Sequence, residues 1–351
     1  MTGRHYTSLP SPEIAAQLDT VLKEIGDEIA GLRLPRLAAV VLGGGYGRGE
    51  GGVCRTGRGD RIYNDLDLFV FSDGAGRREK LRIAAELTPI AARWEKRLGV
   101  AVDLSPVKEL ASLRRVAGKL MYQELVRGWQ PIWGDVDLDR WIPRLPPERL
   151  PFSEAARLIL NRGMGLVLAG ERIAAGSGDA DFIVRNLHKS QLGCGDALLI
   201  AAQKYRWHGA ERLAELDACV TSAGLSRRIV ENYARALRYK AEPRPVLPAD
   251  PQAQWRECRE CLLEAARHIA GCTANATSPE VAVGMHRRAA GERSLKNALR
   301  WTLRSRTLRA AAYAFDPPEV SVAGMLYALL AGGGSCPPCP ARLRRLWSLF
   351  N

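Results

Sequence analysis

The stretch from residue 40 to residue 70 constrains the fold more than any other part of the chain. An apolar run ends at Gly43–Gly45, and a second apolar run follows that carries two carboxylates, Asp65 and Asp67. In a β-strand, residues i and i+2 project to the same face. Asp65 and Asp67 are therefore expected side by side, with the opposite face of the strand formed by Leu66, Leu68 and Val70. The pattern predicts a strand that is acidic on one face and packs into a core with the other.

Two neighbouring carboxylates favour a bound cation. Each negative charge disfavours ionisation of the other unless a cation lies between them. Mg²⁺ prefers oxygen ligands and is usually bound by one or two carboxylates together with substrate phosphates. The glycines Gly43–Gly45, just upstream, let backbone N–H groups approach a phosphate closely. The pattern therefore predicts Mg²⁺ and a phosphorylated ligand at one place.

These elements resemble the nucleotidyltransferase superfamily related to DNA polymerase β. That family combines a glycine turn, an arginine–glycine pair and Asp-x-Asp on the next strand, and it carries a third carboxylate on a later strand. The matching residues here are Gly44-Gly45, Arg48-Gly49, Asp65-Leu66-Asp67 and, in the run Val100–Leu104, Asp103. Many relatives have serine after the turn glycine, where this chain has Gly45. The backbone contact to phosphate survives that difference, but the hydroxyl contact is lost.

The resemblance implies an active enzyme that moves a nucleotidyl group, with ATP the favoured NTP donor, to a hydroxyl acceptor. Two Mg²⁺ ions about 4 Å apart can stabilise the attacking and leaving oxygens of such a displacement. Asp65 and Asp67 would bind both ions, and Asp103 would complete the metal site nearer the acceptor. The phosphate-binding residues would be Gly43, Gly44, Gly45, Arg48 and Lys189.

The chain as a whole predicts an α+β fold. Residues 1–150 would form a catalytic domain with a mixed β-sheet and flanking helices, and residues 151–351 an all-α region. Proline-rich sequence before residue 151 marks the boundary, and the segment 241–251 would divide the helical region into two groups. Strands are expected at 37–42, 65–70, 100–104 and within 129–135, and N-terminal helices at 12–32, 77–98 and 108–127. Later helices are expected at 153–175, 181–207, 210–221, 225–240, 252–270, 279–301, 304–314 and 318–331.

The glycine- and arginine-rich segment 51–62 is expected to be a mobile, exposed loop. Its arginines, Arg55, Arg58 and Arg61, could close over phosphates or a polyanionic acceptor. A passive surface insertion explains the same composition equally well.

The helix 181–207 carries a charged stripe. At about 100° per residue, one face holds Arg185, Lys189, Leu192 and Asp196, and the opposite face holds Ile183, Val184, Leu187, Cys194 and Leu198. The stripe could be solvated surface. Gly193 and Gly195, however, each cost a helix about 1 kcal/mol relative to alanine, and they would allow close approach by a ligand or another helix.

This helix is also similar to the helical domain of small-molecule nucleotidyltransferases, including those that modify aminoglycosides. The resemblance implies that Lys189 contacts the triphosphate and that Asp196 acts as the catalytic base. Glu124 and Asp103 are rival bases. His188 has no partner at metal-ligand spacing and is expected to be a packed or surface residue.

The totals limit the partners. The formal net charge is +13, from 51 Lys and Arg against 38 Asp and Glu, which favours polyanions such as NTPs or RNA or reflects basic, well-solvated faces. No apolar run is long enough to span a membrane or to act as a signal peptide, so no membrane partner is expected and a cytoplasmic location is predicted. Cys258/Cys261 and Cys336/Cys339 have CxxC spacing, which suits either a Zn²⁺ site or buried thiols.

The acceptor is left open by the sequence. A small hydroxylated molecule is favoured by the helical second half. An RNA or tRNA acceptor is favoured by the net charge, although no RNA-binding module is recognisable. Protein AMPylation and a non-enzymatic nucleotide-binding scaffold are further alternatives.

Overall fold

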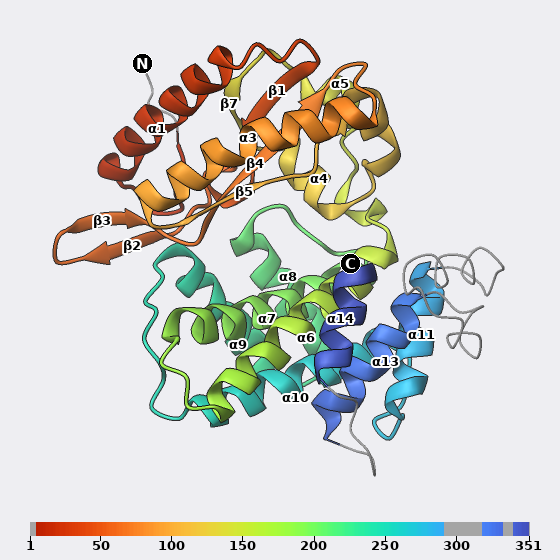
Figure 1. The fold of residues 1–351 in the computed structure, drawn as a ribbon. Helices are drawn as coiled ribbons and strands as arrows, with labels where there is room; N and C mark the ends of the chain where they lie inside the picture. The colour runs from red at the N-terminus through yellow and green to blue at the C-terminus, as the bar shows by residue number, and fades with distance from the viewer. Residues whose placement is uncertain (1–4, 291–317, 333–339, 351) are drawn as a thin grey trace. The chain divides into compact units, whose positions relative to one another are not determined.

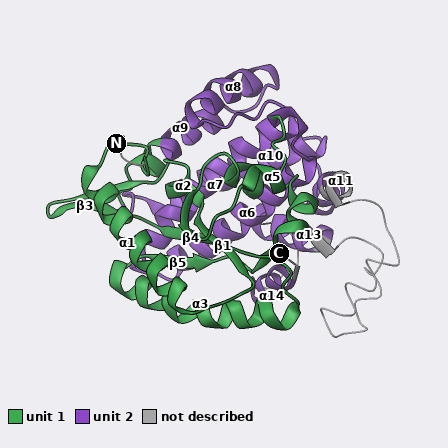
Figure 2. Ribbon diagram, turned by 90° about the horizontal axis from the view of Figure 1, so that it is seen from above, with its two compact units in different colours: residues 1–146, 238–244 green, residues 147–237, 245–351 purple. Residues whose placement is uncertain are grey.

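The computed structural model describes residues 5–290, 318–332 and 340–350 (Figure 1). By its internal contacts the chain divides into two compact units (Figure 2): residues 1–146 with 238–244 form unit 1, and residues 147–237 with 245–351 form unit 2. Unit 1 contains a mixed sheet with helices, and the described part of unit 2 is helical. The predicted α+β fold class is confirmed. The domain limits drawn from the sequence placed the boundary at residue 150 and did not include 238–244 with the first half.

The sheet of unit 1 has the strand order β5–β4–β1–β7, and β6 pairs with β4 beyond β5. The central strand β4 pairs antiparallel with β1 and parallel with β5 and β6, and β7 pairs antiparallel with β1. The strands are β1 (Leu37–Leu42), β4 (Asp65–Ser72), β5 (Ala101–Leu104), β6 (Lys108–Glu109) and β7 (Gln130–Trp133).

Hydrophobic clusters cover both faces of this sheet. One cluster joins Leu66, Leu68 and Val70 of β4 to the helices α1 (Pro12–Gly31) and α3 (Arg77–Leu98). The other joins Phe69 and Phe71 to the turns and short helices that follow β6. Alternation along β4 therefore separates the two clusters, as the side-chain period of two requires.

The long helices of unit 1 end where local signals place their ends. The Ser11 side chain accepts a hydrogen bond from the backbone N–H of Ile14, and Pro12 occupies the first turn of α1. Gly99 ends α3 in the left-handed conformation, with φ of 68°. The ranges predicted for these two helices are confirmed to within one residue.

Two predictions for unit 1 are wrong. The segment 108–127 is β6, a 3₁₀ helix (Leu110–Val116) and α4 (Leu120–Leu125), because Lys108 and Glu109 pair with the end of β4. The segment 51–62 is a β-hairpin of β2 (Val53–Thr56) and β3 (Gly59–Ile62), and not an irregular loop. Its base is buried in the core at Val53 and Ile62, and its tip is exposed. The remaining short elements are α2 (Gly44–Gly47), α5 (Leu138–Trp141) and the 3₁₀ turn Pro147–Arg149.

Unit 2 is built around its first two long helices, α6 and α7, which pack against each other and against α10. Its described helices are α6 (Phe152–Ala174), α7 (Ala180–Ala201), α8 (Gly209–Ser222), α9 (Arg228–Ala241), α10 (Pro251–Ala270), α11 (Ser278–Ala290), α13 (Pro318–Ala331) and α14 (Pro340–Phe350). The last residues of α9, from 238, belong to unit 1. Across the described ranges, no helix combines the length and apolar content needed to cross a membrane.

Two details of unit 2 differ from the sequence prediction, and two predicted stretches cannot be compared. The helix α7 ends at Ala201 and not at residue 207, and Gln203 adopts a positive φ of 58° just beyond its end. The helix α14 was not predicted, although it begins at Pro340 and proline is common in the first turn of a helix. The predicted helix 304–314 and the second half of the predicted helix 279–301 lie outside the described residues.

Candidate functional site

The candidate site is an acidic face shared by two parallel strands. In the register of β4 and β5, Asp67 lies opposite Asp103, and Asp65 lies opposite Ala101. Asp65, Asp67 and Asp103 each offer a carboxylate oxygen, and these oxygens lie within 4.8 Å of one another. Asp65 and Asp67 are partly buried, whereas Asp103 is exposed. Over the ranges that the structure describes, no other group of three His, Cys, Asp or Glu side chains meets this spacing.

This spacing fits an oxygen-coordinated cation. Ligand oxygens around Mg²⁺ lie about 2.1 Å from the ion, so two oxygens on one ion lie about 3 to 4 Å apart. Separations of up to 4.8 Å among the three oxygens are close to that range. Three carboxylates also form the hard, anionic donor set that Mg²⁺ prefers over the nitrogen and sulfur ligands typical of Zn²⁺.

The glycine turn contacts the acidic strand directly. The backbone N–H of Gly43 donates to the carbonyl oxygen of Asp67 at 2.8 Å. A Cβ on Gly43 would lie 2.5 Å from the ring of Phe69. Gly44 has a φ of 60°, and a Cβ there would lie 1.8 Å from Oδ2 of Asp67. The turn therefore requires glycine for its own packing against β4, in addition to any approach by a phosphate.

Asn64, immediately before the acidic strand, was missed by the sequence prediction. Its backbone is left-handed, with a φ of 75°, and its side-chain amide donates a hydrogen bond to Oδ1 of Asp65. The signal available in the sequence was an asparagine, a residue that tolerates the left-handed region, next to a candidate metal ligand.

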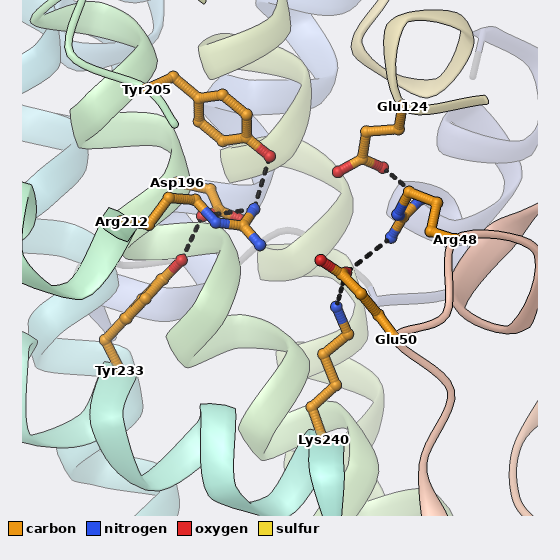
Figure 3. A network of polar contacts seen from close by, with 8 residues as sticks. All are labelled: Arg48, Glu50, Glu124, Asp196, Tyr205, Arg212, Tyr233 and Lys240. Carbon is orange, nitrogen blue, oxygen red and sulfur yellow. Dashed lines mark hydrogen bonds and ion pairs between the residues drawn. The ribbon is translucent and has the colours of Figure 1, made fainter. Parts of the chain in front are cut away.

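Arg48 is part of an ion-pair network within unit 1 (Figure 3). Its guanidinium donates to Glu124 at 3.1 Å and to Glu50 at 3.4 Å. Lys240 donates to the same oxygen of Glu50 at 2.7 Å. All four side chains are 19–30% exposed. Two carboxylates therefore compensate the two cations, and Glu124, a rival base in the sequence prediction, is bound to Arg48.

Lys189 and Asp196 lie on α7, in unit 2. The predicted stripe of Arg185, Lys189, Leu192 and Asp196 is the partly buried side of this helix, and the residues predicted for the opposite face are buried. Close approach at the two glycines is made by other helices. A Cβ on Gly193 would lie 2.3 Å from the side chain of Arg162 on α6, and one on Gly195 would lie 2.4 Å from the ring of Tyr233 on α9.

The carboxylate of Asp196 accepts hydrogen bonds from buried side chains (Figure 3). Tyr233 Oη donates to it at 2.6 Å, and the Arg212 guanidinium donates to both of its oxygens at 3.3 and 3.4 Å. Arg212 also donates to Oη of Tyr205 at 2.5 Å. The Arg212 side chain is 6% exposed and that of Asp196 is 15% exposed, so this is an ion pair largely removed from water.

The remaining candidate residues of unit 2 are packed in its interior. His188 is buried, its Nδ1 lies 3.0 Å from Oε1 of Gln191, and burial lowers its pKa to about 4, with the positive charge of Arg235 acting in the same direction. Burial raises the pKa of Cys258 to about 12 and that of Cys261 to about 11. These two are buried thiols on α10, whereas Cys336 and Cys339 lie outside the described residues.

Comparisons with known proteins give no family. No family model matches the chain, and no curated protein matches it. Among solved structures, the chain is similar to spectinomycin adenyltransferase AAD(9) from Enterococcus faecialis, whose structure contains ATP and spectinomycin. The identity is 14%, the match covers 72% of this chain and 99% of that chain, and the TM-score is 0.39. A likeness at this TM-score is too loose to support an inference about activity.

Proposed function

We propose that this protein is a Mg²⁺-dependent nucleotidyltransferase that moves a nucleoside monophosphate, AMP in the favoured case, from an NTP to a hydroxyl group of a small molecule. The observation that carries the proposal is the meeting of Asp65, Asp67 and Asp103, whose carboxylate oxygens lie within 4.8 Å of one another. A glycine turn lies against the same strand, at Gly44. A cation site beside a glycine turn suits a nucleoside triphosphate, because backbone N–H groups of such turns can bind phosphate.

In this proposal each residue has a limited role. Asp65 and Asp67 act as metal ligands on β4, and Asp103 binds from β5, where its exposure leaves it accessible to an entering acceptor. Gly44 and Gly45 present backbone N–H groups to the β- and γ-phosphates, whereas the N–H of Gly43 is already bonded to the carbonyl oxygen of Asp67. Bound Mg²⁺ supplies Lewis-acid polarisation and charge neutralisation at the phosphoryl oxygens.

Three further roles stay predictions from the resemblance. Lys189 is predicted to contact the triphosphate, and Asp196 is predicted to act as the base. Both residues belong to unit 2, whereas the aspartates of the candidate site belong to unit 1. Arg48 as a phosphate contact would have to exchange or share the carboxylates of Glu50 and Glu124. Asp103 is the alternative base, since it lies in the candidate site itself.

A second candidate, an RNA-directed transferase, is favoured by the hairpin of β2 and β3. Arg55, Arg58 and Arg61 are exposed on it, and the chain carries a formal charge of +13. Exposed arginines suit the sequence-independent phosphate contacts that dominate nucleic-acid affinity. Such contacts release counterions, so binding to RNA would fall steeply with salt, whereas transfer to a small molecule would not.

The test is label transfer from each of four α-³²P NTPs with Mg²⁺, using a panel of small hydroxylated compounds, total RNA, and the protein alone as acceptors. Asp67→Asn removes a carboxylate of the site, and Asp73→Asn, an exposed aspartate just past the end of β4, is the matched control. We expect label on a small molecule, retained in Asp73→Asn and lost in Asp67→Asn. Label on RNA or on the protein itself would show that this molecule, and not a small compound, is the acceptor. No label with any donor would overturn the proposal.

A further inference from the structure

The backbone at Asn64 is unusual for a residue with a side chain. Over the described ranges, a positive φ outside glycine occurs at Arg33, Asn64 and Gln203, and Asn64, at 75°, precedes a candidate metal ligand. Asparagine is among the few residue types that enter this region readily. Residues in sparsely populated backbone regions tend to lie where the surrounding structure fixes them for a purpose.

The residue before Asn64 is fixed on both its main chain and its side chain. The backbone N–H of Tyr63 donates to Oη of Tyr46 at 2.7 Å, and Tyr46 in turn donates to the carbonyl oxygen of Gly52 at 2.8 Å. Oη of Tyr63 lies 2.5 Å from Oη of Tyr239. Tyr46 is 3% exposed and belongs to α2, the helical turn that begins at Gly44. The entry to the acidic strand is therefore fastened to the glycine turn.

The side chain of Asn64 acts on the candidate metal ligand that follows it. Its amide Nδ2 donates to Oδ1 of Asp65. An ionised carboxylate offers about four lone-pair sites, so one hydrogen bond leaves capacity for a cation. The amide is neutral and orients the carboxylate without cancelling its charge, whereas a lysine or arginine at the same place would compete with the cation.

We propose that Asn64 is a positioning residue of the metal site: its left-handed backbone and its amide together set the orientation of the Asp65 carboxylate for a divalent cation. The inference rests on the proposed function, since it assumes that Asp65 binds the metal. Outer partners of metal-binding carboxylates and imidazoles act in this way, and their loss weakens metal binding about 10- to 100-fold.

The test separates the amide from the backbone. Asn64→Gly removes the amide but allows the left-handed conformation, and Asn64→Ala removes both. Gln203→Gly is the matched control, because Gln203 is also left-handed, with a φ of 58°, but lies in unit 2. Mn²⁺ is titrated by electron paramagnetic resonance into the full chain, with and without ATP, and thermal melting without metal is recorded for each variant.

We expect Asn64→Gly to melt near the wild-type temperature while it binds Mn²⁺ at least about 10-fold more weakly. Asn64→Ala, which also disfavours the left-handed backbone, should bind Mn²⁺ still more weakly and melt at a lower temperature, and Gln203→Gly should bind Mn²⁺ as the wild type does. Wild-type affinity in Asn64→Gly would overturn the inference and leave the proposed function intact. If neither the wild type nor Asp67→Asn binds Mn²⁺, the proposed function is wrong and this inference is wrong with it.

Discussion

The carboxylate of Asp67 occupies the space that a side chain on Gly44 would need: a Cβ on Gly44 would lie 1.8 Å from Oδ2 of Asp67. The two residues come from different elements, the helical turn α2 and the strand β4. The neighbouring Gly43 donates its N–H to the carbonyl oxygen of Asp67 at 2.8 Å. The glycine turn therefore contacts both the main chain and the side chain of Asp67. The position of one candidate metal ligand therefore depends on a residue that has no side chain.

The first prediction is that Gly44→Ala displaces Asp67 and abolishes most of the transfer activity. An alanine must both strain the backbone at a φ of 60° and push the carboxylate aside. A displacement of about 1 Å at a reacting centre can cost about 100-fold in rate. Label transfer and Mn²⁺ binding should both fall by at least an order of magnitude in this variant.

Gly99→Ala is the control for backbone strain alone. Gly99 has a φ of 68°, and a Cβ there would meet nothing within 4 Å. It should lose roughly 1 kcal/mol of folding free energy, the usual cost of a left-handed alanine, and keep its metal affinity. If Gly44→Ala matches Gly99→Ala in label transfer and in Mn²⁺ binding, the contact between Gly44 and Asp67 does not matter for function.

The second prediction concerns Asp196, expected from the resemblance to be a base. Its partner Arg212 is 6% exposed, and removing one member of such a pair leaves an uncompensated buried charge. Asp196→Ala should therefore lower the free energy of unfolding by about 3 kcal/mol or more. The double variant Asp196→Leu/Arg212→Met should lose less than Asp196→Ala, because no buried charge remains. Urea denaturation of the three proteins measures the difference.

A more exposed pair on the same helix provides the comparison. Asp181 and Arg185 are paired at 3.2 Å, with side chains 43% and 27% exposed. Asp181→Ala should cost no more than about 1 kcal/mol. A purely catalytic Asp196 would give the opposite pattern, in which Asp196→Ala unfolds like the wild type and loses only label transfer.

Local patterns in the sequence predicted the local parts of this structure. The alternation of Asp65, Leu66 and Asp67 predicted that the two aspartates share a face and that Leu66 enters a core on the other, because the side-chain period of two is a property of the strand alone. It did not predict that the face of the aspartates also enters a core farther along β4, at Phe69 and Phe71. The start of α1 at Ser11 and the end of α3 at Gly99 could also be predicted, because a helix cap depends only on residues next to it in the sequence.

Contacts between distant residues could not be read in the same way. Arg212 and Tyr233, which bind Asp196, lie 16 and 37 residues beyond it in the sequence, and no spacing rule connects them to it. The segment after β5 has a helical pattern, but pairing with the end of β4 and hydrogen bonds from Gly74 and Ala75 to Glu109 prevail at its start. Here tertiary contacts override a local preference.

The third prediction is an acid-dependent loss of stability caused by His188. Burial lowers its pKa to about 4, below the ordinary value of 6.5, so between these values the unfolded chain binds the proton more readily. The stability that comes from the neutral ring is complete above pH 6.5 and is lost as the pH falls toward 4. A shift of this size corresponds to roughly 3 kcal/mol.

Other groups titrate over the same range, so the variant His188→Gln isolates the effect. Urea denaturation between pH 7 and pH 4 should show a smaller loss of stability in His188→Gln than in the wild type. The control is His268→Gln, an exposed histidine on α10, which should follow the wild-type curve. Parallel curves for the wild type and His188→Gln would show that protonation of His188 does not limit acid stability.

The fourth prediction is that Gly45→Ser strengthens nucleotide binding. The nearest atoms to a Cβ on Gly45 are the carbonyl oxygen of Glu50 and Cα of Gly51, both at 3.6 Å, which is ordinary van der Waals contact. A serine therefore fits, and its hydroxyl would add the phosphate contact that the resemblance leads one to expect at this position. One new hydrogen bond of about 1 kcal/mol should lower the Kd for Mg²⁺–ATP roughly fivefold.

Gly45→Ala fills the same space without the hydroxyl and is the matched control. It should bind Mg²⁺–ATP as the wild type does, so calorimetric titration of the two variants isolates the hydroxyl. Gly47→Ser tests the steric argument in the same turn, since a Cβ there would lie 2.4 Å from the carbonyl oxygen of Leu42 and should destabilise the fold. Equal affinities in Gly45→Ser and Gly45→Ala would mean that no phosphate lies within reach of residue 45, and the proposed position of the triphosphate over Gly43–Gly45 would be wrong.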